Sequence, residues 1–141
     1  MRLQPAKFRK IGLLILRSGL GLMLIFHGYP KIFGGPEMWQ EVGSAMQSIG
    51  ITFLPAAFGF LAGITEFFGG IFLILGLFFR PTLSFLICLM AVATATHIAN
   101  DDPFVLVSHP IELAIVFISL LFLGPGKYSL KHRLNKPRRR W

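Results

Sequence analysis

Several ionisable side chains interrupt stretches of the sequence that are otherwise apolar. They are two carboxylates, three histidines and two cations: Glu66, Glu112, His27, His97, His109, Arg17 and Lys31. Carboxylates and imidazoles move protons and form hydrogen bonds, and a nearby cation keeps a carboxylate ionised. A charge in hydrocarbon costs at least ~2.5 kcal/mol even on lenient insertion scales, so each of these groups implies a partner or a function. The sequence therefore predicts that this chain carries its chemistry inside a membrane.

The apolar stretches are long enough to cross a bilayer as helices. Hydrophobic residues make up 54% of the 141 residues and charged ones only 14%, which is too little polar surface for a soluble globule of this size. A helical span needs about 20 apolar residues. We predict an all-α, four-helix transmembrane bundle that forms one domain over residues 1–141 and ends in a basic cytoplasmic tail. The expected spans are 11–29, 53–79, 81–99 and 104–123, and the tail is 124–141.

A cleaved signal peptide is the alternative for the N-terminus, because basic residues precede its apolar run. Arg17 interrupts that run and no small-x-small cleavage site follows it. We therefore expect the segment to remain as the first span.

Positive charge is distributed unevenly around the predicted spans. Apart from Arg17, every lysine and arginine but one precedes residue 11, is Arg80, or follows residue 123; Lys31 is the exception. The positive-inside rule then places both termini in the cytoplasm of a cell that carries this protein in its inner or plasma membrane. The net charge of +8 is thus expected to orient the chain and to contact anionic lipids rather than nucleic acid.

Helical spacing predicts which faces meet inside the bundle. Glu66 shares a stripe with Gly59, Gly63 and Gly70, so it should face protein at a close helix contact. The first span carries another stripe, and the last span groups its polar residues on one face that we expect to point inward. These sets are Arg17, Gly21, Leu24, Gly28 and Lys31 on the first span, and His109, Glu112, Val116 and Ser119 on the last.

The buried charges should pair, and the depth of each residue indicates how. Arg17 is the only cation well inside a span, so we expect it to be the structural partner of Glu66 or Glu112. His27, Lys31, His97 and His109 all fall near the outer edge, which predicts a polar pocket in the outer half of the bundle. We expect no metal site, because no H-E-x-x-H or E-x-x-H spacing occurs, and Cys88 is the only cysteine.

Two features of the connections remain open from the sequence. Residues 34–52 are too long for a simple turn, and their apolar spacing indicates a short helix that either anchors at the membrane surface or also covers the pocket. Pro110 permits either a bent helix that begins near Pro103 or a helix that begins at Ser108 after a dipping loop.

The order of several short segments resembles the DoxX family of small four-helix inner-membrane proteins. The segments are RSGLGLMLIFHGYPKIFG from Arg17, GITEFFGGIFLILGLFFRP from Gly63, ATATHIA from Ala93 and HPIELAIVFISLLFLGPGKYSL from His109. The resemblance implies a membrane protein that in some members serves quinone-coupled oxidation, as the small subunit of a thiosulfate:quinone oxidoreductase, and in others accompanies redox-defence enzymes. It points to His27, Lys31, Glu66, Arg80, His97 and Glu112 in this chain, and it does not assign catalysis to them.

The function we expect is that of a quinone-linked accessory or subunit of a membrane oxidoreductase. His27 or His97 would bind the quinone headgroup, Glu66 and Glu112 would pass protons, and a partner or a bound cofactor would supply the electrons. The alternatives are a non-catalytic scaffold in which the charges only fix helix packing, and a small proton-coupled carrier. Gly59-x-x-x-Gly63 is compatible with a homo-oligomer as well as with internal packing.

Cysteine labelling in intact cells tests the predicted orientation. In a background with Cys88→Ser, cysteines placed at Glu37 and Asp101 should react with a membrane-impermeant reagent, whereas a cysteine at Lys131 should react only after the cells are lysed. External labelling at Lys131 would contradict the assignment of both termini to the cytoplasm.

Overall fold

A computed structural model describes residues 5–134, and within them all the regular structure is helical. Four helices are long and apolar enough to cross a membrane, which confirms the all-α, four-span prediction; the orientation remains a prediction. Shorter helices follow the first and last of the long ones. The elements are α1 (Pro5–Phe33), α2 (Gly35–Gly43), the 3-10 helix η1 (Ser44–Ile49), α3 (Pro55–Leu75), α4 (Phe79–Ala99), α5 (Phe104–Leu123) and α6 (Leu130–Leu134).

The helix boundaries largely follow proline and glycine. Pro55 occupies the first turn of α3, where a missing amide proton leaves no bond unmade, and Gly76 ends α3 in the left-handed conformation at φ 67°. The helix therefore stops short of residue 79, where the predicted span ended. A three-residue turn, 76–78, joins it to α4, so α3 and α4 run antiparallel as expected.

Helix α5 resolves the uncertainty about Pro110. The helix begins at Phe104 and continues through Pro110, which is buried within it, so the start near Pro103 is correct and the dipping loop before Ser108 is not. Pro103 occupies the N-cap position, and no side chain caps the helix. Asp102 pairs with His97 at the end of α4.

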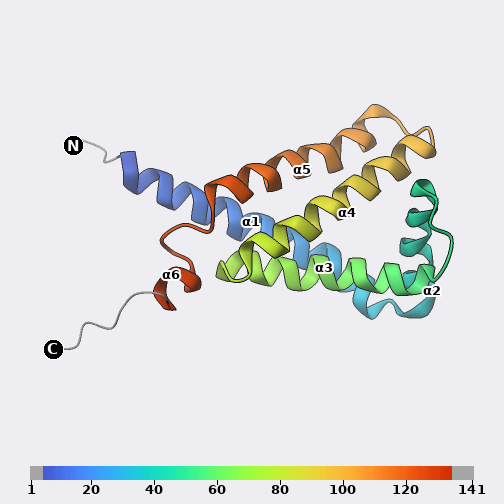
Figure 1. Ribbon diagram of the computed structural model, residues 1–141, viewed down its shortest axis with the longest axis horizontal. Helices are drawn as coiled ribbons and strands as arrows, with labels where there is room; N and C mark the ends of the chain where they lie inside the picture. Colours follow the sequence, from blue (N-terminus) through green and yellow to red (C-terminus); the bar gives the residue numbers. More distant parts are fainter. Residues whose placement is uncertain (1–4, 135–141) are drawn as a thin grey trace.

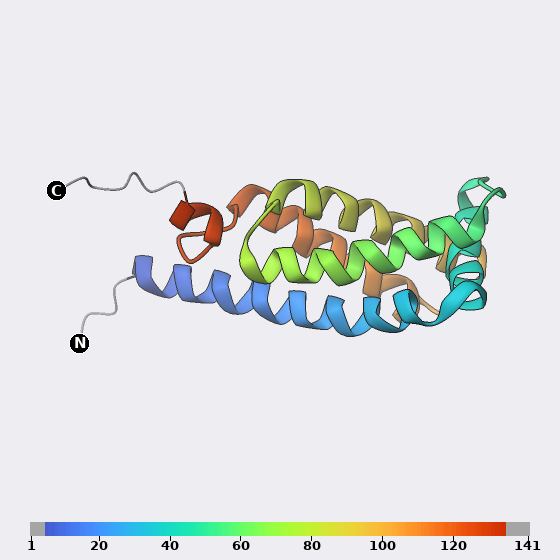
Figure 2. The same cartoon turned by 90° about the horizontal axis from the view of Figure 1, so that it is seen from below.

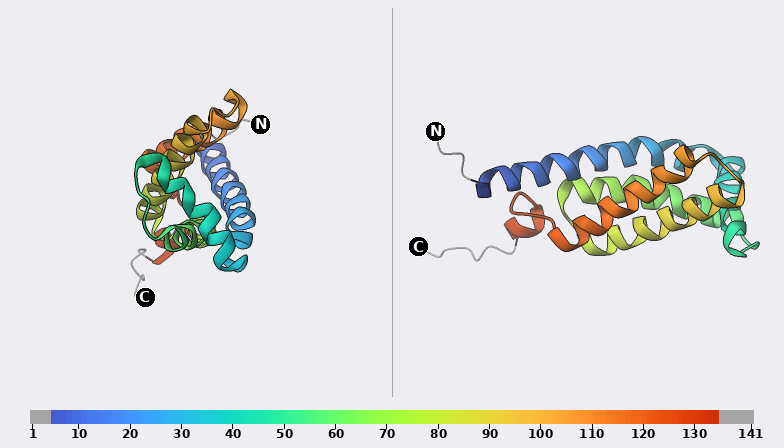
Figure 3. Two further views of the ribbon diagram at one scale, coloured as in Figure 1. Left: turned by 90° about the vertical axis from the view of Figure 1, so that its right-hand side faces the viewer. Right: turned by 90° about the horizontal axis from the view of Figure 1, so that it is seen from above.

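The long helices pack as two pairs. Helix α1 lies along α3, and α4 lies along α5, while α2 crosses one end of the bundle and packs against α3 (Figure 1; Figure 2). We call this end of the bundle the α2 end; the turn between α3 and α4 and the short helix α6 lie at the opposite end (Figure 3).

Glycine permits the close contact between α1 and α3. A Cβ atom at Gly21 would collide with the backbone oxygen of Gly70, and one at Gly70 would collide with the oxygen of Gly21. The two backbones thus touch directly, as small residues allow in membrane helix pairs. This contact confirms the predicted glycine-lined stripes on both helices.

The apolar core occupies the half of the bundle away from α2. Its buried members come from all four long helices and are concentrated where the α3–α4 turn meets the end of α5: Leu24, Leu73, Phe79, Leu83, Leu86, Met90, Phe117 and Leu120. Toward the α2 end lies a cavity whose wall combines apolar side chains with Lys31, Glu66 and His97, as described below.

Arg17 is buried at the core end, with 1% of its surface exposed. Its guanidinium donates hydrogen bonds to the carbonyl oxygens of Pro125 and Tyr128, at 2.8 and 2.7 Å. The expectation that Arg17 pairs with Glu66 or Glu112 is therefore wrong. The reason is that α5 ends before Gly124, and the segment after it leaves backbone carbonyl groups beside Arg17 that have no hydrogen-bond donor within a helix.

Replacing Arg17 should test this anchoring role. We expect Arg17→Met to lower the free energy of unfolding by about 3 kcal/mol, because two buried hydrogen bonds from a charged donor are lost. The measurement is denaturant unfolding in detergent micelles. Arg80→Met, which removes an exposed arginine near the same end, should change stability by less than about 0.5 kcal/mol. Equal losses in the two variants, or a loss in Arg17→Met that depends on whether Glu66 is present, would contradict the anchor.

Candidate functional site

A cavity of about 460 Å³ lies at the α2 end, and we call it the α2 chamber. Its volume is in the range of ligand pockets. The chamber is enclosed by the end of α1, by α2 and η1, and by the facing sides of α3 and α4. The lining residues are Lys31, Glu41, Val42, Gly43, Ser44, Ala45, Met46, Phe58, Ala62, Glu66, Leu89, Met90, Val92, Ala93, Thr96 and His97.

An ion pair between α1 and α3 forms one wall of the chamber. The ammonium of Lys31 donates a hydrogen bond to Oε1 of Glu66 at 2.7 Å and lies 2.6 Å from Oε2. The approach to Oε2 has the distance of an ion pair but not the angle of a hydrogen bond, so this buried oxygen has no hydrogen-bond donor among the described residues. Glu66 is 5% exposed, whereas 27% of the Lys31 side chain remains accessible. The ion pair links α1 to α3, and both the ammonium and the carboxylate retain the capacity for a further hydrogen bond.

His97 lies on the α4 wall of the same chamber. Its Nδ1 is 2.8 Å from Oδ2 of Asp102, and this contact orients the imidazole ring. When the histidine is neutral and Nδ1 carries the proton, Nε2 is an acceptor; when it is protonated, both nitrogens are donors. A residue of this kind exchanges protons with a bound ligand without leaving its position.

The α2 chamber is covered by the predicted loop helix, now seen as α2 and η1. Trp39 of α2 donates from Nε1 to the carbonyl of Ile32 at 3.2 Å, and Gly43 touches the α3 backbone at Pro55 so closely that a Cβ would collide there. From α4, the Thr96 hydroxyl lies 3.2 Å from both the carbonyl oxygen of Ala45 and the Ser48 hydroxyl, and 2.9 Å from the carbonyl oxygen of Val92 in its own helix. These contacts fix the cover to α1, α3 and α4.

The structure brings together only part of the predicted site. Lys31, Glu66 and His97 line the chamber, but His27, His109 and Glu112 are exposed on the helix surfaces and do not line it. The expectation that the polar face of the last span points inward is therefore wrong for His109 and Glu112. The cause is that α5 packs on α4 through a different stripe, which contains Pro110 and Phe117.

The sequence interpretation missed the polar residues that support the site. Thr96 precedes His97 in the chain and ties α4 to the cover, and Asp102 follows His97 by little more than one turn. A histidine followed by a carboxylate across a helix end was the available signal for this orienting pair.

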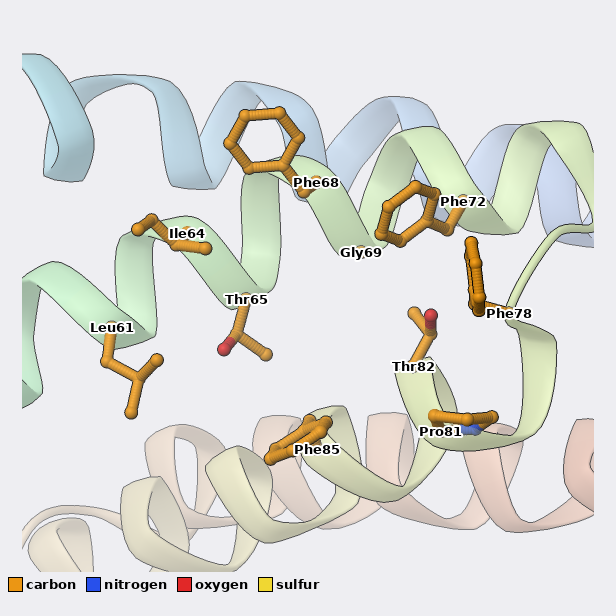
Figure 4. A pocket seen from close by; sticks show the side chains of 10 residues that line it. All are labelled: Leu61, Ile64, Thr65, Phe68, Gly69, Phe72, Phe78, Pro81, Thr82 and Phe85. Carbon is orange, nitrogen blue, oxygen red and sulfur yellow. The ribbon is translucent and has the colours of Figure 1, made fainter.

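A second, apolar cavity of about 320 Å³ lies between α3 and α4 on the core side of the chamber. We call it the α3–α4 groove. Figure 4 shows Thr65 and Phe85 facing each other across it, with Phe72 and Phe78 near the turn. Its lining is almost wholly hydrocarbon: Leu61, Ile64, Thr65, Phe68, Gly69, Phe72, Phe78, Pro81, Thr82 and Phe85.

The groove follows the chamber along the same pair of helices. Leu61 and Thr65 of the groove directly precede Ala62 and Glu66 of the chamber, and Phe85 lies one helical turn before Leu89. The two cavities thus occupy consecutive segments of α4 and neighbouring faces of α3.

No cluster of three or more histidine, cysteine, aspartate or glutamate side chains with metal-binding geometry occurs within residues 5–134. Cys88 is exposed and is not among the residues that line the chamber or the groove.

A double-mutant cycle tests the Lys31–Glu66 pair. Lys31→Met and Glu66→Leu should each lower the free energy of unfolding by about 3 kcal/mol, because each leaves one charge without its partner. The double variant should lose less than the sum of the two single losses. Lys7→Met is the matched control, since Lys7 is exposed on the same helix. Strictly additive losses in thermal and denaturant unfolding would contradict a coupled pair.

Comparison with known proteins agrees with the architecture. The model of the DoxX family matches residues 12–99, which extend from α1 to the end of α4 and include every residue that lines the α2 chamber. No curated protein and no solved structure matches the chain. The family match covers more than half of the sequence, and together with four long apolar helices it identifies the chain as an integral membrane protein of the DoxX family.

Proposed function

We propose that this chain is a quinone-binding subunit that works with a membrane oxidoreductase. The observation that carries the proposal is that a chamber with charged and polar groups in its wall and an almost wholly apolar groove lie on adjacent parts of the same two helices, α3 and α4. A membrane quinone has the same division, a polar headgroup that exchanges protons and a long hydrocarbon tail.

The α2 chamber offers suitable partners for the headgroup. Lys31 and protonated His97 donate hydrogen bonds, which the two quinone carbonyl oxygens accept. In the reduced form these oxygens become hydroxyl groups, and the Glu66 carboxylate, whose Oε2 has no hydrogen-bond donor among the described residues, would accept a hydrogen bond from one of them. Reduction of the quinone takes up two electrons and two protons, and His97 and Glu66 are the groups placed to relay the protons.

The α3–α4 groove would hold the tail. Four phenylalanine rings line it, and it carries no charged residue. The electrons come from a partner enzyme, since one cysteine per chain provides no dithiol of its own.

A scaffold without ligand is the second candidate, and the Lys31–Glu66 contact favours it, because an ion pair between two helices stabilises the bundle without any ligand. Arg17 supports the same view, since its contacts with Pro125 and Tyr128 are structural. The two candidates differ in whether the purified protein binds quinone.

Tryptophan fluorescence gives a direct assay of binding. The chain has two tryptophans, Trp39 and Trp141, so Trp141→Phe leaves only the one in the helix that covers the chamber. A short-chain ubiquinone should quench Trp39 saturably in nanodiscs. His97→Ala should raise the dissociation constant about 5- to 50-fold, because a headgroup oxygen loses its donor. His27→Ala and His109→Ala are matched controls outside the chamber and should bind normally.

Failure of the wild-type protein to bind would reject the quinone site and leave the scaffold. Binding that is weakened equally by all three histidine variants would place the ligand outside the chamber. Quinone extraction from the protein purified out of native membranes provides an independent measurement.

A separate variant tests whether the α3–α4 groove holds the quinone tail. Thr65→Phe, which fills the α3–α4 groove, should weaken binding of the tailed quinone at least 5-fold and leave a tail-free quinone unaffected. Ser84→Phe places the same ring on an exposed position of α4 and is the control. Equal effects on both quinones would reject the groove as the tail site while leaving the headgroup site intact.

A further inference from the structure

Glu112 presents a carboxylate on the outside of a membrane helix. It lies within the apolar span Phe104–Leu123 and is exposed, and no ion pair or hydrogen bond involves its side chain within residues 5–134. Facing lipid, an ionised carboxylate at this depth is strongly unfavourable. The exposed face of α5 therefore calls for a polar partner that a single copy does not supply.

The residues around Glu112 form a helix-packing seam, which we call the α5 seam. Its members repeat at spacings of four and three, which is the pattern of two helices that pack side by side at a small angle. They are Val105, His109, Glu112, Val116, Ser119 and Leu123, all exposed except the half-buried Val116. A separate stripe with the same spacing, which contains Pro110, Phe117 and Leu120, is buried in the bundle. Helix α5 thus has one occupied packing face and one free one.

We propose that a second copy of this chain covers the α5 seam, so that two parallel α5 helices form the centre of a homodimer. The seam carries a donor, His109, and an acceptor, Glu112, and this makes it complementary to itself. Copies inserted in the same orientation are related by a two-fold axis along the membrane normal, and such an interface repeats each contact twice.

The pairing fits the geometry of parallel helices. His109 and Glu112 are three residues apart, so they differ in depth by roughly 4.5 Å. Side chains of this length bridge that offset, and His109 of each copy then donates to Glu112 of the other. The two carboxylates, which would otherwise face each other across the axis, each receive a donor. The homodimer does not depend on quinone binding, because the seam and the chamber share no residue.

Disulfide crosslinking in native membranes tests the dimer. In a Cys88→Ser background, Ser119→Cys should form a dimer of twice the chain mass on mild oxidation, because Ser119 lies on the seam. Ser84→Cys is the matched control, since both serines are exposed and both donate to the carbonyl four residues earlier in their own helix. It should give no dimer.

A charge exchange tests the His109–Glu112 contact itself. His109→Glu should reduce the crosslinking of Ser119→Cys at least 10-fold, because four carboxylates then meet at the axis. The exchanged double variant His109→Glu/Glu112→His restores a donor and an acceptor and should regain the yield. Thermal unfolding of each variant shows whether a loss of crosslinking is only a loss of fold.

Several outcomes would overturn the proposal. They are absence of the Ser119→Cys dimer in folded protein, equal crosslinking of Ser119→Cys and Ser84→Cys, and a folded double variant that does not recover. Crosslinking of Ser119→Cys to a different membrane protein, with no band at twice the chain mass, would assign the seam to a foreign partner instead.

Discussion

The contact between Lys31 and Glu66 determines how the α2 end of the bundle is built. Neither charge is stable alone in the membrane. Each lies on the face of its helix that packs against the other helix. The pair forms where glycines bring α1 and α3 together: a Cβ at Gly28 would collide with the backbone of Phe67, and one at Gly63 would crowd Lys31 itself. The ion pair in turn keeps a polar wall at the end where the apolar core is absent, and this leaves room for the α2 chamber.

The bundle holds Arg17 and Lys31 by different means. Arg17 reaches two backbone carbonyls that the chain exposes after α5, and a planar guanidinium suits two separate acceptors. Lys31 meets one carboxylate with a compact ammonium group, which retains a further proton for a ligand. The arginine therefore completes the fold, whereas the lysine combines a structural contact with access to the chamber.

The α2 chamber and the α5 seam also differ in their relation to the DoxX family. The residues that line the chamber all fall within the matched region, so the chamber is built from family elements. Helix α5 lies beyond the matched residues and contributes the exposed seam with Glu112. On this view α1 to α4 provide the ligand site, and α5 provides the surface through which the copies assemble.

The sequence by itself determined the class of the protein and much of its layout. Runs of about 20 apolar residues fix the spans, prolines and glycines fix most helix ends, and the spacing of Glu66 with glycines fixes its burial, because these are local properties of a helix. The tertiary structure decided which charges meet. From depth along the helix, the sequence predicted that Arg17 pairs with a carboxylate. In the structure the chain turns back after Gly124, and its backbone carbonyl groups accept hydrogen bonds from Arg17, a contact that no spacing rule predicts. The rotation of α5 about its axis, set by its packing on α4, likewise turned His109 and Glu112 outward and left His97 as the one histidine in the chamber.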